Sequence, residues 1–249
     1  MTKRQPVRIG TAGWSVPRES AGDFPGEGTH LVRYSRGLNC AEINSSFYRP
    51  HKQSTWERWR DSVPAGFRFS VKAPRAITHD AALKCPPEVL LAFLKQVGAL
   101  EAKLGPLLFQ LPPSLEFDAK TAREFLAVLR KHFSRAVACE PRHPSWFGEE
   151  ATAMMSEFRI ARVAADPACV RDAAVPAGSS ELVYFRLHGS PRRYYSSYED
   201  KYLESLAEEL RGIQKRRDVW CIFDNTASGA AIRNALQVNR LLATANDQR

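Results

Sequence analysis

Short apolar or alternating segments recur along the chain, and each is bounded by Gly, Pro or polar residues. These segments are rich in Val, Ile, Leu and Phe, a composition that favours β-strands. The pattern predicts eight strands, at Val7–Trp14, Cys40–Phe47, Phe67–Ala73, Leu104–Leu111, Arg135–Arg142, Ala161–Pro167, Leu182–Gly189 and Asp218–Asn225.

Between these segments, apolar residues recur at three- and four-residue spacing, which predicts amphipathic helices. The clearest helices are expected at Pro86–Lys103, Ala119–His132, Tyr198–Gln214 and Ser228–Thr244, and weaker ones at Thr29–Gly37, Ser54–Asp61 and Trp146–Phe158. Pro86 and Pro87 can open the first helix without losing a needed donor, and Asp118 is a good N-cap for the second. The segment Ala168–Ser180 is expected to be a loop with at most a short helix.

Strands that alternate with helices predict parallel βαβ units, and eight repeats favour a closed barrel over an open sheet. A chain of 249 residues with 44% hydrophobic content has the size common for such a barrel. No low-complexity linker or composition shift divides the chain. The sequence therefore predicts an α/β fold, a TIM-type (β/α)8 barrel that forms a single domain over residues 1–249.

The ends and the cysteines indicate a cellular compartment. Met1–Arg8 is polar and basic, and no apolar run approaches the roughly 18 residues that a membrane span needs. The five cysteines are widely separated and include no CxxC pair, which argues against a disulfide framework or a zinc ribbon. Cys139 and Cys221 lie in apolar strand-like runs and are expected to be buried, reduced thiols. We expect a soluble, cytoplasmic protein with no membrane partner.

The formal net charge of +9 favours anionic partners, which include phosphorylated metabolites, nucleic acid and acidic surfaces. The sequence contains no G-x-G-x-x-G, Walker, nucleophile-elbow or kinase motif, which argues against nucleotide-cofactor and acyl-transfer chemistry. Charge alone does not choose among the anionic partners.

Polar side chains gather at the predicted strand ends. Alternate residues of a barrel strand face the lumen, and the residues between them pack under the helices. Where the apolar residues of a strand take the helix side, the polar residues between them are expected to point inward. These inward positions are Glu42, Asn44 and Ser46, then Arg68, Ser70 and Lys72, then Glu140 and Arg142, and then Tyr184, Arg186 and His188. Further polar residues end the remaining strands: Gln110, Asp166, Asp224 and Asn225. Active sites of barrels are built at the carboxyl ends of the strands, so a site is expected there.

Ionisable residues in a barrel interior would each cost several kcal/mol if they were unpaired. They must therefore neutralise one another or meet solvent and a ligand. A purely structural plug of ion pairs is the alternative to a site. Apolar layers would serve stability more simply, so the pattern favours a site.

Seven segments together resemble one protein family. They are GTAGW (10–14), EINSSFYR (42–49), FRFSVKAPRAITH (67–79), GPLLFQLPPS (105–114), EPRHPSW (140–146), YFRLHGS (184–190) and FDNTASGAAIRNA (223–235). In this order they resemble the YecE-like proteins, the domain of unknown function 72. The resemblance implies a TIM-type barrel and no settled activity. Ala12 stands where the family often has Ser, and Asp224 where many members have Asn before the retained Asn225.

Candidate roles follow from residue chemistry. Lys72, Arg142 and Arg186 can converge on a phosphate or carboxylate, because Arg offers bidentate geometry. Glu140 and His188 are the acid/base candidates, joined by Glu42 as a third catalytic candidate. The expected substrate-binding set is Lys72, Arg142, Arg186, Asn44, Gln110, His143, Trp14, Tyr48, Asp166, Asp224 and Asn225. His79 and His143 are loop alternatives for proton transfer.

The same strand ends offer a possible metal site, and two loops offer further candidate sites. A metal site assembled from His188 and the neighbouring carboxylates is disfavoured by the surrounding cations, so we expect no metal and no cofactor. The loop Arg192–Tyr195 is a candidate lid, and Asn225–Gly229 could present backbone N–H groups to a phosphate.

Three functions stay open at the level of sequence. The first is an enzyme that acts on an anionic, phosphorylated or sugar-like substrate by acid/base chemistry. The second is a nucleic-acid-directed phosphodiesterase or binding protein. The third is a noncatalytic ligand-binding barrel, which mutually saturated rim charges would favour.

Overall fold

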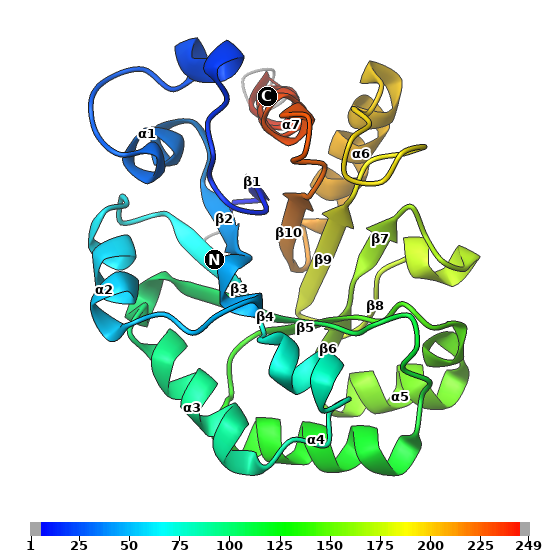
Figure 1. The fold of residues 1–249 in the computed structure, drawn as a ribbon. Helices are drawn as coiled ribbons and strands as arrows, with labels where there is room; N and C mark the ends of the chain where they lie inside the picture. The colour runs from blue at the N-terminus through cyan, green and yellow to red at the C-terminus, as the bar shows by residue number, and fades with distance from the viewer. Residues whose placement is uncertain (1–5, 245–249) are drawn as a thin grey trace.

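The computed structural model describes residues 6–244, with strands at the centre and helices around them (Figure 1). The strands are β1 Arg8–Thr11, β2 Cys40–Ile43, β3 Arg68–Lys72, β4 Leu104–Gln110, β5 Val137–Glu140, β6 Ile160–Arg162, β7 Ala164–Asp166, β8 Ala177–Gly178, β9 Leu182–Leu187 and β10 Asp218–Phe223. The α-helices are α1 His30–Gly37, α2 Gln53–Asp61, α3 Pro87–Gly98, α4 Ala119–His132, α5 Glu149–Glu157, α6 Asp200–Ile213 and α7 Ala230–Thr244. Strands and α-helices alternate along the chain, as the sequence pattern predicts, except between β6 and β9, where no α-helix intervenes.

The strands are arranged in two sheets. One has the order β1-β10-β9-β7 and is parallel, and the other has the order β2-β3-β4-β5-β6-β8, in which β8 runs antiparallel to β6. A parallel bridge between Ala12 and Glu42 connects β1 to β2, and the Gly13 N–H donates to the Glu42 carbonyl oxygen over 2.8 Å. At β6 and β7 the chain passes from one sheet to the other through Val163 alone. The fold is an α/β arrangement of one parallel and one mixed sheet.

Two predicted elements differ from the observed ones. The strand expected over Ala161–Pro167 is divided at Val163, because β6 pairs with β5 whereas β7 pairs with β9. The segment Ala168–Ser180, expected to be a loop with at most a short helix, contains a short 3₁₀ helix but also the two-residue strand β8, which was not predicted. Gly178 lies there at φ +77°, a conformation that residues with a Cβ rarely adopt.

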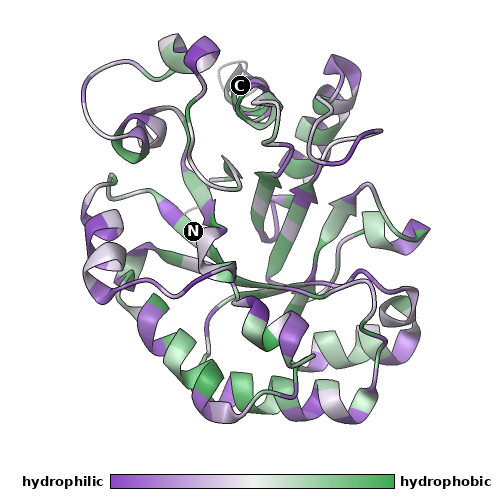
Figure 2. Cartoon of the chain, in the orientation of Figure 1, coloured by the Kyte–Doolittle hydropathy of each residue, from purple (hydrophilic) through white to green (hydrophobic). Residues whose placement is uncertain are grey.

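Local sequence sets the helix boundaries. Asp118 Oδ1 accepts the Thr121 N–H over 2.8 Å at the start of α4, which confirms the predicted N-cap. Pro87 is the first residue of α3, where its missing N–H costs nothing. Apolar residues lie on the strands and the helix faces toward them, and polar residues lie outside (Figure 2). The helices therefore form where amphipathic spacing and end signals agree.

The buried apolar residues form two separate clusters. The larger one packs strand residues such as Phe69, Val71 and Phe185 against the helices, as the predicted alternation requires. The smaller one comes from the other strand faces of both sheets: Cys40, Leu108, Ala138, Ala161, Val163, Ala165, Leu182, Tyr184, Trp220 and Ile222. This inner cluster lies below the polar residues at the strand ends and supports them.

The predicted burial of Cys139 and Cys221 is confirmed, and both are free thiols. Burial raises the pKa of each thiol, so neither is poised to react as a thiolate. None of the helices within the described residues is long and apolar enough to cross a membrane.

Candidate functional site at the strand ends

The structure brings together the ionisable residues that the sequence places at five strand ends. Glu42 is on β2, Lys72 on β3 and Glu140 on β5, while Arg186 is on β9. Arg142, His188 and Asp224 follow β5, β9 and β10 within two residues. All seven side chains are buried. Parallel pairing aligns these ends, so residues far apart in sequence meet at one edge.

Arg186 is the centre of the network. Its Nε and NH2 donate to Glu42, with NH2 2.7 Å from Oε1. Its NH1 lies 3.1 Å from Glu140 Oε2, and NH2 lies 3.0 Å from Asp224 Oδ2. Burial alone would lower the pKa of Arg186, but these three carboxylates raise it well above its usual value. Arg186 therefore stays charged and fixes the carboxylates in place.

Glu42 is fully buried, and hydrogen bonds hold its carboxylate. The Tyr184 hydroxyl donates to Glu42 Oε2 over 2.9 Å, and Ser70 Oγ lies 2.8 Å from the same hydroxyl. Burial and the nearby Glu42 raise the pKa of Tyr184 well above its usual value, so the phenol remains a donor. Both Glu42 oxygens thus have partners, and Glu42 positions Arg186.

His188 connects two carboxylates. Its Nδ1 lies 3.0 Å from Asp224 Oδ2, and its Nε2 lies 2.8 Å from Glu140 Oε1. Nε2 is also 2.8 Å from Arg142 NH2, and Arg142 is paired with Glu140 over 2.6 Å. The carboxylate requires a donor at Nε2, whereas the guanidinium requires an acceptor. Nε2 therefore lies within hydrogen-bonding distance of both a donor, Arg142, and an acceptor, Glu140.

Two of these carboxyls are held in the ionised form. Burial would raise the pKa of Glu140, but Arg142, His188 and Arg186 together lower it. Burial likewise opposes the ionised form of Asp224, and Arg186 and His188 lower its pKa. Both carboxyl groups are therefore ionised at neutral pH.

Lys72 differs from the two arginines. Among residues 6–244 no carboxylate is within ion-pairing distance of Lys72 Nζ, which lies 3.9 Å from the centre of the Phe47 ring. Burial, followed by repulsion from Arg186, lowers the pKa of Lys72 to about 8. Lys72 is thus a buried ammonium group whose charge is not consumed by a direct ion pair.

Small differences in exposure show which side of the site faces outward. Glu42, Glu140 and His188 are 0% exposed, whereas Lys72, Arg142 and Asp224 are 6%, 8% and 6% exposed. A ligand would therefore first meet Lys72, Arg142 and Asp224.

The candidate lid Arg192–Tyr195 lies against this site. The Tyr194 ring packs edge-on against His188, with 5.7 Å between ring centres. The guanidinium of Arg192 lies 4.0 Å from the centre of the Tyr195 ring. The segment is tied to the loop after β10, where the Asn225 amide donates to the Ser196 carbonyl oxygen over 2.9 Å. The side chain of Asn225 thus supports the segment.

Two backbone N–H groups of the loop Asn225–Gly229 already donate hydrogen bonds within the protein. The Ala227 N–H donates to the Tyr194 carbonyl oxygen, and the Gly229 N–H donates to that of Thr226. These two groups are therefore occupied, which weakens the hypothesis of a phosphate site in this loop.

The structure does not bring every predicted binding residue into the network. Asp166 accepts a hydrogen bond from the Tyr198 hydroxyl over 2.8 Å, on the side toward α6. Trp14 packs against Trp59 and Phe69 in the outer cluster. The placement of Asp166 corrects the assignment of strand faces, because Val163 and Ala165 point into the inner cluster and the residue after them points out.

The other predicted binding residues lie at the margin. Tyr48 is 73% exposed, and His143 bonds to Ser145 through Nδ1, 2.8 Å from Oγ. Gln110 reaches Arg186 only at 3.5 Å, and Asn44 has a buried Oδ1 without a hydrogen-bond partner among the described residues.

Tyr184 and Ser70 are members of the network that the sequence did not assign to the site. Alternation placed both side chains inward, which is the signal that could have found them. Phe47 also contacts the site through Lys72, and the His79 ring packs edge-on against the Phe47 ring, with 4.9 Å between ring centres. Among residues 6–244 no group of three or more His, Cys, Asp or Glu side chains is arranged to hold a metal ion.

Comparison with known proteins gives a family and a fold. Residues 8–249 match the family model described as "Protein of unknown function DUF72". The chain is 33% identical over 147 residues to the UPF0759 protein YecE of Escherichia coli K12, covering 58% of this chain and 52% of YecE. This match spans about half the length of that relative. The chain is also 27% identical to the UPF0759 protein YunF of Bacillus subtilis, covering 95% and 94% of the two chains.

Two crystal structures of DUF72 family proteins share the fold. The one from Thermotoga maritima has a TM-score of 0.79 and 26% identity, covering 95% of this chain and 99% of the other. The one from Enterococcus faecalis has a TM-score of 0.80 and 22% identity, covering 96% of each chain. The family resemblance found in the sequence is thereby confirmed.

Proposed function

Because the chain belongs to the DUF72 family, whose description assigns no activity, we propose a function from its own residues: an enzyme that acts on an anionic, phosphorylated or sugar-like substrate by acid/base chemistry. The observation that carries this proposal is that His188 contacts both Asp224 and Glu140 next to Lys72, whose ammonium group has no carboxylate partner. It combines a site of proton transfer with a site of anion attraction.

The proposed framework of this site is a TIM-type barrel. It would run β1-β2-β3-β4-β5, then β6 with β7, then β9 and β10, and return to β1. The Ala12–Glu42 bridge and the direct succession of β6 and β7 support this closure. The inner apolar cluster, drawn from strands of both sheets, is the expected filling of a barrel lumen.

Each residue has a distinct proposed role. Glu140 and His188 exchange a proton with the substrate, and Asp224 holds the imidazole through Nδ1. Lys72 and Arg142 bind the anionic group, because both reach the exposed edge of the site. Glu42 and Arg186 position the others from beneath.

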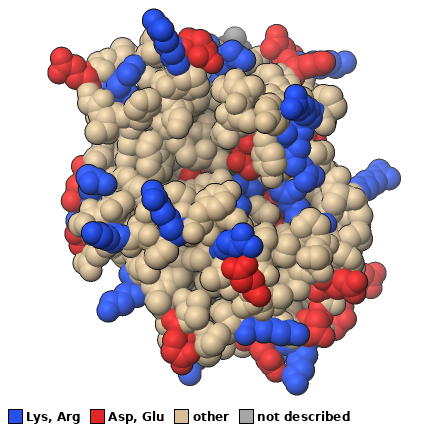
Figure 3. Space-filling model, viewed as in Figure 1, with Lys and Arg blue, Asp and Glu red and all other residues tan. Residues whose placement is uncertain are grey.

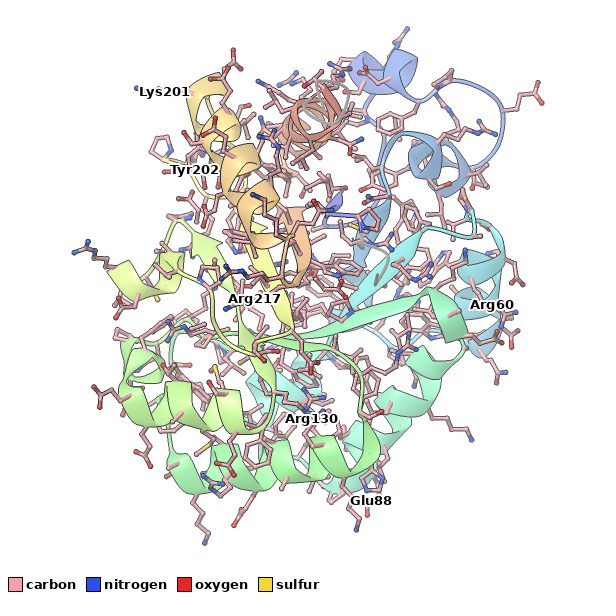
Figure 4. All side chains as sticks on the ribbon, turned by 180° about the vertical axis from the view of Figure 1, so that it is seen from behind. Arg60, Glu88, Arg130, Lys201, Tyr202 and Arg217 are labelled. Carbon is pink, nitrogen blue, oxygen red and sulfur yellow. The ribbon has the colours of Figure 1, made fainter. Side chains whose placement is uncertain are left out.

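The binding part is tested with a thermal-shift screen of sugar phosphates, other phosphorylated metabolites, neutral sugars, oligonucleotides and divalent metals. A ligand that binds the folded state raises the melting temperature. We expect phosphorylated compounds to raise the melting temperature of the wild type. Lys72→Gln should bind the same compounds at least tenfold more weakly. Lys201→Gln is the matched control, because Lys201 is exposed on α6 (Figure 4). Equal affinity in Lys72→Gln would remove Lys72 from the binding site.

The catalytic part is tested with Glu140→Gln on the substrate that the screen identifies. This change keeps the shape of the side chain and removes its capacity to accept a proton. We expect kcat to fall by about 10²–10⁴, the usual contribution of a general acid or base, while the variant remains folded by circular dichroism. Undiminished turnover in a folded variant would exclude Glu140 from the mechanism.

A nucleic-acid-directed activity is the second candidate. The net charge of +9 and the exposed Tyr194 and Tyr195 beside Arg192 favour it. On the face drawn in Figure 3, however, acidic and uncharged surface separates the Lys and Arg side chains into several groups. Saturated rim charges would favour the noncatalytic alternative. Arg142 and Arg186 are paired with carboxylates in this way, whereas Lys72, which has no such pair, argues against it.

A further inference from the structure

A second polar pocket lies at the opposite ends of the strands from the candidate site. We call it the basal pocket and define it by Arg8, Arg68, Arg135, Asp218 and Trp220, which line a cavity of about 260 Å³. Arg8, Arg68 and Asp218 are the first residues of β1, β3 and β10, and Arg135 precedes β5. In the view from behind, Arg217 marks the entry into β10 at this end (Figure 4).

Backbone carbonyl groups hold the three guanidinium groups of the basal pocket. NH1 of Arg8 donates to the Gly66 oxygen over 2.5 Å, and NH1 of Arg68 donates to the Ala65 oxygen over 2.7 Å. Arg135 donates to the carbonyl oxygens of Glu101 and Leu104. A guanidinium group has five N–H donors, so each of these arginines keeps donors beyond the anchoring bonds. The anchors restrict the side chains before any ligand arrives.

The three positive charges of the basal pocket are compensated only in part, by Asp218. Among residues 6–244 no carboxylate lies within ion-pairing distance of the three arginines, although Asp218 is part of the lining. Partial burial, and after it the charge of Arg68, lowers the pKa of Arg135. Burial also lowers the pKa of Arg8; repulsion from Arg68 adds to this effect, and Asp218 opposes it. An anion between these groups would relieve that repulsion.

The floor of the basal pocket is rigid. A Cβ at Gly105 would lie 2.5 Å from the Trp220 ring, so the ring passes directly over this glycine. Trp220 in turn stacks on Tyr184, with 6.2 Å between ring centres. The basal pocket is thus separated from the candidate site by packed aromatic side chains and has to bind its ligand independently.

We propose that the basal pocket binds a small phosphate-bearing anion, such as inorganic phosphate, pyrophosphate or the phosphate end of a metabolite. Arginine forks match two oxygens of a phosphate group, and the cavity is smaller than the roughly 300–1,000 Å³ typical of sites for larger ligands. Asp218, which also lines the cavity, would disfavour anions that place further negative charge next to it. This inference does not depend on the proposed acid/base chemistry.

The test is calorimetric titration of the full chain with inorganic phosphate and with pyrophosphate at low ionic strength. We expect Arg68→Gln to weaken the basal-pocket binding at least tenfold, and Arg68→Lys to weaken it less because the charge remains. Arg233→Gln is the matched control, since Arg233 is exposed on α7 away from the basal pocket. Circular dichroism verifies that each variant is folded.

Lys72→Gln separates this proposal from the proposed function. Binding at the basal pocket should be retained in Lys72→Gln, whereas binding at the candidate site should be lost. No phosphate or pyrophosphate binding, or binding equal in the wild type and Arg68→Gln, would overturn the basal-pocket proposal. Binding that is equal in the wild type and Arg68→Gln but lost in Lys72→Gln would leave the proposed function intact.

Discussion

Glu140 combines complete burial with three cationic or protonatable neighbours, Arg142, Arg186 and His188. Removing one charge from such a network leaves the others desolvated and without their counter-ion. We therefore expect Glu140→Gln to lower the free energy of unfolding by about 3–5 kcal/mol, the usual cost of breaking a buried ion pair. Urea-induced unfolding of the variant and the wild type measures this difference.

Glu157→Gln is the control for this prediction, because it removes one carboxylate from an ion pair with Arg123 that is exposed to solvent. Water solvates the remaining guanidinium, so we expect little change in stability. If the two variants were equally stable, the network around Arg186 would not be desolvated as the structure has it.

Lys72 should give the protein a characteristic dependence on pH. Its pKa is about 8 in the folded protein, against 10.5 for an ordinary lysine. Between these values the unfolded chain binds a proton that the folded protein does not, so stability rises with pH in that window. We expect the stability of the wild type relative to Lys72→Met to rise by about 3 kcal/mol from pH 8 to 10.5. Urea unfolding of both proteins across this range checks it, and a flat difference would contradict it.

At the residue scale, the sequence predicted the charged members of the site because their alternation was unambiguous. In β9, large apolar residues such as Val183 and Phe185 fix the outer face, so Arg186 had to point inward. In β7 the neighbours of Asp166 are alanines, which pack on either face. The sequence of β7 therefore does not show which residues face the lumen. Asp166 was expected at the strand-end site but points away from it, toward Tyr198.

At the element scale, the seam between β1 and β2 is the contact that the proposed barrel depends on most. A Cβ at Gly10 would lie 2.1 Å from the Cys40 carbonyl oxygen, so the two strands approach closely only because residue 10 has no side chain. We expect Gly10→Ala to lower stability by about 1–3 kcal/mol, the usual effect of overpacking. Thermal and urea unfolding measure it.

Gly98→Ala provides the comparison for Gly10→Ala, because a Cβ at Gly98 meets nothing within 4 Å. It lies in α3, where alanine has the higher helix propensity, so the variant should be at least as stable as the wild type. Stability unchanged in Gly10→Ala would indicate that β1 and β2 are not packed together, and the proposed closure would fail.

Helices and strands with regular apolar spacing and clear end signals were predictable from the sequence. Which strands pair with one another was not. The helix α4 matches its predicted range because the apolar spacing and the Asp118 cap agree. The change of pairing at Val163 depends on which strands lie beside it, and a local pattern carries no such information. The strand β8 is only two residues long, too short for any period.

At the scale of the whole molecule, the net charge of +9 attracts polyanions without selecting a sequence. Because acidic and uncharged surface interrupts the basic groups on the face drawn in Figure 3, we expect weak binding of a duplex oligonucleotide. A protein that makes 6–10 phosphate contacts loses about 10³–10⁵ in affinity between 50 and 200 mM salt. Fluorescence anisotropy across this range should show binding that disappears by 200 mM and is unaffected by Lys72→Gln. Binding that persists at 200 mM and weakens in Tyr195→Ala would instead favour the nucleic-acid-directed function, because stacking on an aromatic ring is insensitive to salt.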